Sequence, residues 1–184
     1  MWPWSCRAGE RVGVAPATSP HGGVVPGARS VLVEVVLLRA SPRLAYRVLV
    51  GHPSAAETPD AAALRVAGLP AHAWRRPDLV VHSTSWRYDT AGRVVLTYVV
   101  LPDPDVAGPA TELASPRIAR GVASGRPTPA RVGVDEVVAH AVRHLAFLLP
   151  TDPQVRRAVG PAAEWAAALR EWDPAPAGAA PATR

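Results

Sequence analysis

The side chains best suited to chemistry in this chain are histidines and the hydroxyl groups that follow one of them. In VVHSTSWRYDTAGRVVLTYVV, residues 80–100, His82 is followed by Ser83, Thr84 and Ser85. Imidazole changes charge near neutral pH, so His82 is a candidate general acid or base. A row of polar side chains inside an apolar strand predicts either a site or a surface that contacts another molecule. Backbone hydrogen bonds from the hydroxyl groups are the simpler alternative.

Three further side chains with metal-binding chemistry are spaced four residues apart. Glu136, His140 and His144 share one side of a predicted helix, because residues i and i+4 are neighbours on a helix surface. Two histidines at this spacing can bind one divalent metal, with the carboxylate as a third ligand and His82 completing the set. The alternative is that these histidines lie at the boundary of an amphipathic helix, where an apolar ring with a polar tip fits well.

Glu34 is the remaining candidate for acid–base chemistry. It interrupts the apolar segment VLVEVVLLR, residues 31–39. A buried carboxylate needs a partner or a raised pKa, and Arg47 on the next predicted strand is the nearest candidate partner. In the preferred alternative, the segment is an edge strand and Glu34 points to water.

Several common sites have no counterpart in the sequence. There is no G-x-S-x-G elbow for a serine nucleophile. The glycines of GVASGRPTPARVG, residues 121–133, lack the G-K-[ST] ending of a phosphate-binding loop, and no G-x-G-x-x-G occurs. A serine hydrolase, a P-loop enzyme and a dinucleotide-binding enzyme are therefore disfavoured.

The net charge of +5 comes largely from the two ends of the chain. Residues 30–173 contain 16 arginines against 14 acidic residues, and the chain contains no lysine. Nucleic-acid binding is unlikely on this distribution, because a nucleic-acid footprint concentrates basic residues on one face. Alanine, valine, proline, glycine and arginine are abundant, which indicates a GC-rich gene.

The remaining composition predicts a cytoplasmic protein. Cys6 is the single cysteine of the chain, so an internal disulfide is excluded. The first 29 residues lack the apolar stretch of a signal peptide, and no run approaches 18 apolar residues. We therefore expect no membrane association.

Hydrophobic periodicity predicts two β-hairpins followed by helices. The strands fall at 31–39, 46–51 and within 80–100, and a short helix capped by Thr58 or Asp60 falls between the hairpins. Helices follow at 134–149, 154–158 and 162–172. The predicted fold is α+β: an antiparallel sheet of about four strands packed by two or three C-terminal helices.

The predicted domain covers residues 30–173, between a disordered extension (1–29) and a disordered Pro/Ala tail (174–184). In the second hairpin, a four-residue loop at 89–92 sets His82 opposite Val99 and Trp86 opposite Val95. Apolar side chains then occur on both faces of the sheet, so both faces should be covered.

Two functions follow from these features. The preferred one is a non-catalytic binding module that holds a small-molecule ligand or a second copy of itself. It uses the hairpin and the loop 103–133, with the binding residues Ser83, Thr84, Ser85, Trp86, Arg87 and Tyr98. The alternative is a small hydrolase or acid–base enzyme, in which His82 and Glu34 are catalytic and a divalent metal is held by Glu136, His140 and His144.

Overall fold

The computed structural model describes residues 31–40, 43–121, 129 and 131–176. The predicted extension 1–29 lies outside the described residues, as does most of the predicted tail. Residues 174–176 are described, and the backbone N–H of Ala175 donates to the carbonyl oxygen of Arg143, 3.3 Å away.

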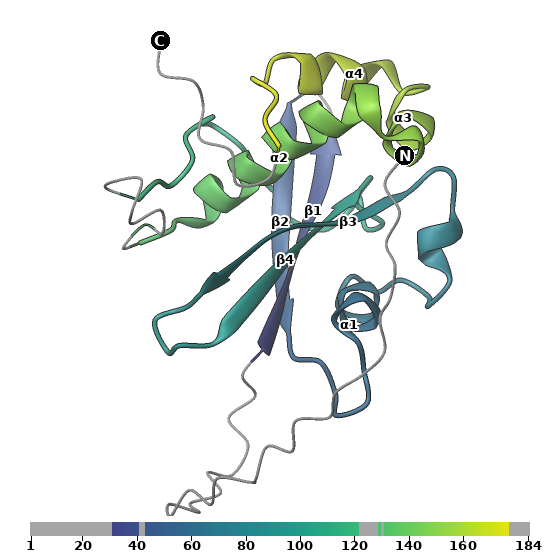
Figure 1. The fold of residues 1–184 in the computed structure, drawn as a ribbon. Helices are drawn as coiled ribbons and strands as arrows, with labels where there is room; N and C mark the ends of the chain where they lie inside the picture. Colours follow the sequence, from purple (N-terminus) through teal and green to yellow (C-terminus); the bar gives the residue numbers. More distant parts are fainter. Residues whose placement is uncertain (1–30, 41–42, 122–128, 130, 177–184) are drawn as a thin grey trace, which may run out of the picture.

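The chain forms two β-hairpins with a helix between them, followed by three helices (Figure 1). The strands are β1 (Val31–Ala40), β2 (Leu44–Gly51), β3 (Val80–Tyr88), β4 (Val94–Leu101) and β5 (Thr111–Glu112). The helices are α1 (Pro59–Val66), α2 (Val134–Thr151), α3 (Pro153–Val159) and α4 (Ala163–Arg170), with a 3₁₀ turn η1 (Ala73–Arg75). No helix among them has the length and apolarity to cross a membrane.

The predicted α+β class is confirmed, but the predicted sheet is wrong in one respect. The strand order is β3-β4-β1-β2-β5, and β4 runs parallel to β1. Each hairpin is antiparallel as predicted. The parallel pair arises because the connection through α1 carries the chain across the sheet, so that the second hairpin joins on the far side of β1. The two-residue β5, within the predicted loop 103–133, is too short to produce a periodic signal.

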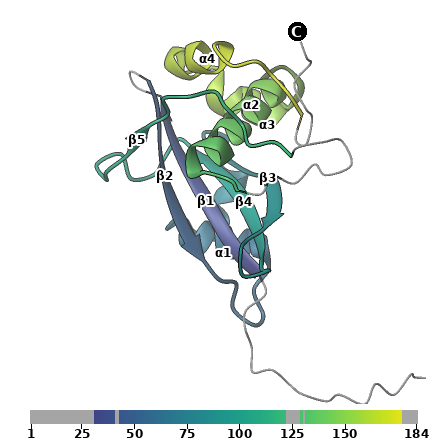
Figure 2. The same ribbon diagram turned by 90° about the vertical axis from the view of Figure 1, so that its left-hand side faces the viewer.

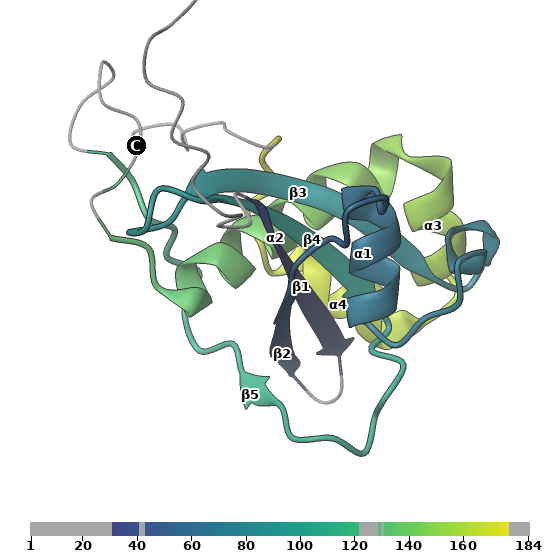
Figure 3. The same cartoon turned by 90° about the horizontal axis from the view of Figure 1, so that it is seen from below.

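Helices cover both faces of the sheet, as the mixed pattern of the hairpin predicts (Figures 2 and 3). An apolar core lies on each face, between the sheet and these helices. Helices α2, α3 and α4 pack on one face, against side chains that include Val36, Leu38 and Val99. Helix α1 packs on the other face, against side chains that include Val35 and Leu37. Alternating residues of β1 thus point into different cores, which explains its continuous apolar sequence.

Side-chain caps set the starts of these helices. The Oγ1 of Thr58 accepts a hydrogen bond from Ala61 N, 3.2 Å away, at the start of α1. Asp152 caps α3, as its position after Pro150 predicts. Glu136 accepts a hydrogen bond from Gly133 N, 2.9 Å away, at the start of α2. Through this bond, Glu136 caps the N-terminus of α2.

The predicted register of the second hairpin is confirmed in one half and wrong in the other. His82 lies opposite Val99 as predicted. Trp86, however, lies opposite Leu96, and Val95 lies opposite Arg87. The faces of the sheet are therefore exchanged in the half of the hairpin nearest its loop.

A longer loop and a β-bulge together cause this shift. Tyr88 pairs with Val94 and not with Arg93, so five residues, 89–93, separate the two strands where four were predicted. Within this loop Asp89 N donates to Arg93 O, 2.9 Å away, and Gly92 adopts a φ of 76°. The bulge lies between Ser83 and Ser85, where Thr84 is the extra residue and restores the register.

Candidate functional site

A cavity of about 520 Å³ lies beside β3, which is an edge strand of the sheet. It is bounded by β3, the first two turns of α2 and described parts of the loop between β5 and α2. Its lining residues are Ser83, Thr84, Ser85, Trp86, Arg87, Leu96, Ile118, Ala119, Pro129, Val132, Glu136, Val137 and His140. Five of the six predicted binding residues, and part of the predicted binding loop, thus line one cavity.

The sixth predicted binding residue, Tyr98, lies elsewhere. Its side chain is buried in the core beneath α1, and its hydroxyl donates to Asp60 Oδ1, 2.6 Å away. Burial and this carboxylate raise the pKa of Tyr98 well above its usual range. Tyr98 therefore joins α1 to the sheet and does not line the cavity.

The β-bulge explains the row of polar residues in β3. Thr84 is buried, and its Oγ1 donates to the carbonyl oxygen of Thr97, 3.3 Å away. The extra residue turns Ser85 and Arg87 toward the face covered by α2, while Trp86 points to the other face. Without the bulge, Arg87 would lie on the wrong face to reach Glu34.

Glu34 is buried and paired, which contradicts the preferred edge-strand interpretation. β1 is the central strand of the sheet, and Glu34 is only 6% exposed. Arg87 donates to both carboxylate oxygens, at 2.9 and 2.8 Å, and Thr97 Oγ1 donates to Oε1 at 3.0 Å. The need for a cationic partner is confirmed, but the partner is Arg87.

Arg47, the predicted partner of Glu34, binds a different carboxylate. Its guanidinium donates to Asp103 at 2.9 Å to each oxygen, and Arg39 donates to the same carboxylate at 2.9 and 2.7 Å. Burial acts to raise the pKa of Asp103, but hydrogen bonds from Arg47, the backbone of Asp105 and Arg39 outweigh it, and the pKa is lowered. The beginning of the predicted loop 103–133 is thereby attached to β1 and β2.

His82 and His144 are brought together, although they are 62 positions apart in the sequence. Their Nε2 atoms are 3.1 Å apart, and their ring centroids are 5.2 Å apart. Burial lowers the pKa of both rings, and for His144 the neighbouring His82 and His140 lower it further. The surroundings of both imidazoles therefore favour the neutral form.

The third histidine of the cluster, His140, lies in the wall of the cavity one turn before His144. Burial is the main cause of its lowered pKa, with a further contribution from Arg143, while the backbone of Thr84 acts in the opposite direction. Among the described residues, no three His, Cys, Asp or Glu side chains are close enough together to hold a metal. The predicted set of Glu136, His140 and His144 is therefore not assembled, and His82 joins only His144.

The burial of His140 predicts a measurable pH dependence of stability. Its folded pKa lies below the ordinary value of 6.5, so the unfolded chain binds more protons as the pH falls. The free energy of unfolding should therefore decrease as the pH is lowered from about 7.5 to about 5.5. Urea unfolding across this range, with a chelator present, should show a shallower dependence in His140→Gln. The exposed His72, changed to glutamine, is the control; equal slopes for all three proteins would contradict the prediction.

Several lining residues of the cavity were not singled out from the sequence. Ile118 and Val132 lie in the predicted binding loop 103–133, but this segment has no periodic pattern that would indicate them individually. Val137 was predicted only as part of the apolar face of a helix. Comparison of the chain with family models, curated proteins and solved structures finds no match. The residues of the cavity and of the histidine cluster are therefore the basis for assigning a function.

Proposed function

We propose that this chain is a binding module that holds one small, largely apolar ligand in the cavity beside β3. The observation that carries the proposal is the cavity itself, whose volume of about 520 Å³ lies in the usual range for small-molecule sites. Most of its exposed lining surface is apolar, and six polar or charged side chains also line it: Ser83, Thr84, Ser85, Arg87, Glu136 and His140. Apolar walls with interspersed polar groups are typical of ligand sites.

The polar groups of the cavity favour a ligand with a neutral hydrogen-bond acceptor. Three N–H groups of Arg87 donate to Glu34 and Thr97, which leaves two of the five guanidinium N–H groups without a partner among the described residues. Glu34 offsets the charge of Arg87, so a free carboxylate or phosphate gains little here. A carbonyl or hydroxyl oxygen fits better, with Ser85 and His140 as further polar contacts.

An aromatic pair lies at the edge of the cavity. Trp86 borders the cavity but points to the other face of the sheet, where its 64% exposed side chain meets the ring of Tyr88 edge to face with centroids 5.7 Å apart. Such an exposed aromatic group supplies a large contact area at low entropic cost. The alternative of an acid–base enzyme is less well supported, because Glu34 is held by Arg87 and Thr97 and the pair His82–His144 does not line the cavity.

Nile red tests this proposal, because it is an uncharged apolar dye with a carbonyl oxygen and its fluorescence reports an apolar environment. We expect saturable binding of one dye per chain. Ala119→Trp fills the cavity from the loop side and should weaken binding at least about tenfold, equivalent to about 1.4 kcal/mol.

Ala163→Trp, on the exposed first turn of α4, adds the same side chain outside the cavity and should leave the affinity unchanged. Unsaturable binding, or equal affinities for Ala119→Trp and the unmodified protein, would contradict the proposal.

A further inference from the structure

The contact between β3 and α2 contains a pair of histidines whose geometry suits a metal ion. Nε2 of His82 and Nε2 of His144 are 3.1 Å apart. In a tetrahedral zinc site with bonds of 2.0–2.1 Å, two ligand nitrogens are about 3.3 Å apart. We propose that His82 and His144 form an open site for one divalent transition-metal ion of the zinc class. This site is separate from the proposed ligand cavity and does not depend on it.

The second nitrogen of His144 gives independent support. His144 is only 8% exposed, and its Nδ1 is buried without a hydrogen-bond partner among the described residues. In a hydrogen bond between the two neutral rings, one Nε2 carries the proton and the other accepts it. Nδ1 of His144 is then left as a buried acceptor or a buried donor, and either is unfavourable without a partner.

A metal ion bound to both Nε2 atoms is compatible with these surroundings. Each ring then carries its proton on Nδ1, and metal-bound histidines commonly direct this N–H toward a backbone carbonyl group. The backbone of Ala175 lies close to His144 and favours the protonated ring. Ala175 is held there by its own N–H bond to Arg143 O, so a small adjustment places an acceptor at Nδ1.

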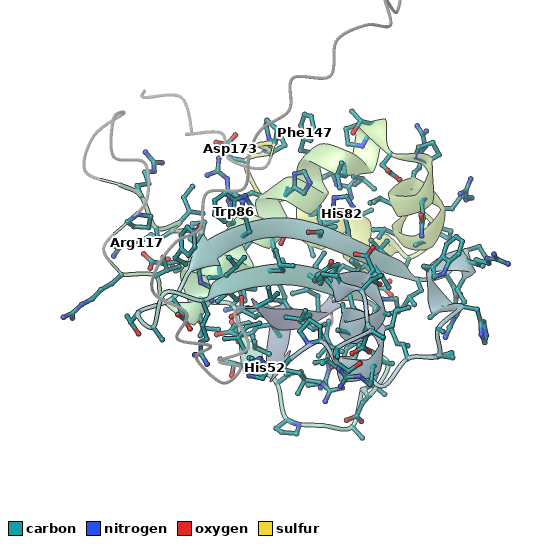
Figure 4. The ribbon with its side chains drawn as sticks, turned by 60° about the horizontal axis from the view of Figure 1, so that its bottom comes forward. His52, His82, Trp86, Arg117, Phe147 and Asp173 are labelled. Atoms are coloured by element: carbon teal, nitrogen blue, oxygen red, sulfur yellow. The ribbon has the colours of Figure 1, made fainter. Side chains whose placement is uncertain are left out.

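The surroundings of the pair combine a nearby carboxylate with a neutralised cation. The charge of Asp152 acts on His82 and favours a positive charge there. Arg143 is the cation on α2, and it donates to the carbonyl oxygen of Asp173 at 2.9 Å and to its carboxylate at 3.3 Å. Phe147 lies beside His144, with ring centroids 6.3 Å apart. Figure 4 shows Phe147 on α2 and His82 on β3. A cation at the pair thus faces a neutralised arginine, a carboxylate and an aromatic ring.

The ligand set indicates the class of metal and the openness of the site. Imidazole nitrogens favour zinc, copper and nickel over magnesium and calcium, which require oxygen ligands. No third His, Cys, Asp or Glu completes the set within the part of the chain that the structure describes. The remaining coordination positions would be filled by water or by an exchangeable ligand, and the affinity should be lower than that of a structural zinc site.

Titration of the untagged, full-length Cys6→Ser protein with zinc chloride, followed by calorimetry, tests the proposal. The Cys6→Ser background removes the single thiol of the chain. We expect one zinc ion per chain, and an affinity at least about tenfold lower in His82→Gln and in His144→Gln. His82 is only partly buried, so His82→Gln remains informative if His144→Gln fails to fold.

His72→Gln is the control, because it removes an exposed histidine outside the contact between β3 and α2 and should leave zinc binding unchanged. Cobalt provides a second measurement, since the visible spectrum of bound Co²⁺ reports nitrogen ligation, and its bands should disappear in His82→Gln. The proposal is overturned if the protein binds no zinc, if binding persists in His82→Gln, or if His72→Gln loses binding equally.

Discussion

Replacing Glu34 with alanine is expected to lower the free energy of unfolding by about 3 kcal/mol. The substitution removes the partner of Arg87, whose side chain is 26% exposed, and removes an acceptor of the buried Thr97 hydroxyl. The guanidinium is then left largely buried without a counter-charge, which costs more than the ion pair itself contributes. Urea unfolding followed by circular dichroism measures the loss.

Two comparisons separate the cost of a buried charge from the loss of any acidic residue. Glu112→Ala removes the partner of Arg43 from an exposed pair, 2.7 Å apart, and should leave stability nearly unchanged. The triple variant Glu34→Leu, Thr97→Val and Arg87→Leu replaces the whole polar group with apolar side chains and should recover much of the lost stability. Equal losses for Glu34→Ala and Glu112→Ala would refute the buried-pair explanation.

Asp103→Ala is expected to be more damaging, with a loss of about 4 kcal/mol. The Asp103 side chain is fully buried, and it accepts from two arginines on neighbouring strands and from the backbone N–H of Asp105, 3.0 Å away. Without this carboxylate, Arg39 and Arg47 lie side by side, and the exposed carboxylate of Asp105 compensates their charges only in part. The turn after β4 also loses one of its attachments to the sheet.

Asp105→Ala is the matched control for this prediction. Asp105 lies in the same turn and its carboxylate is 3.4 Å from Arg47, but its side chain is 53% exposed. Exposed ion pairs contribute little, so the loss should be much smaller than for Asp103→Ala. Chemical unfolding of both variants at pH 7 measures the two losses in the free energy of unfolding. Similar losses would show that Asp103 acts only through the turn and not as a buried anion.

The local structure of this protein could largely be predicted from its sequence. The 3.6-residue period of the segment 134–149 predicted α2, and the candidate caps Thr58 or Asp60 predicted the start of α1. Both hairpins follow from apolar segments separated by turn residues. These features depend on residues close together in the chain, so their signals are complete in the sequence.

The candidate site could be predicted only in part. Ser83, Ser85 and Arg87 were predicted as binding residues because polar side chains are unexpected in an apolar strand, and all three line the cavity. The bulge at Thr84 left no recognisable pattern, because one extra residue in a strand resembles an ordinary residue in sequence. Since a slip of one residue exchanges the faces of a strand, the face occupied by Arg87 could not be predicted.

The pairing of charged and polar groups depended entirely on how the hairpins assemble. Arg47 lies on the strand next to Glu34, yet it donates to the carboxylate of Asp103. Arg87, two strands away, binds Glu34 because the bulge turns its side chain toward the same face of the sheet. The contact between His82 and His144 likewise requires α2 to cross the edge strand. Local propensities determine helices, strands and turns along the chain, whereas the choice among several arginines or histidines is made by packing between distant segments.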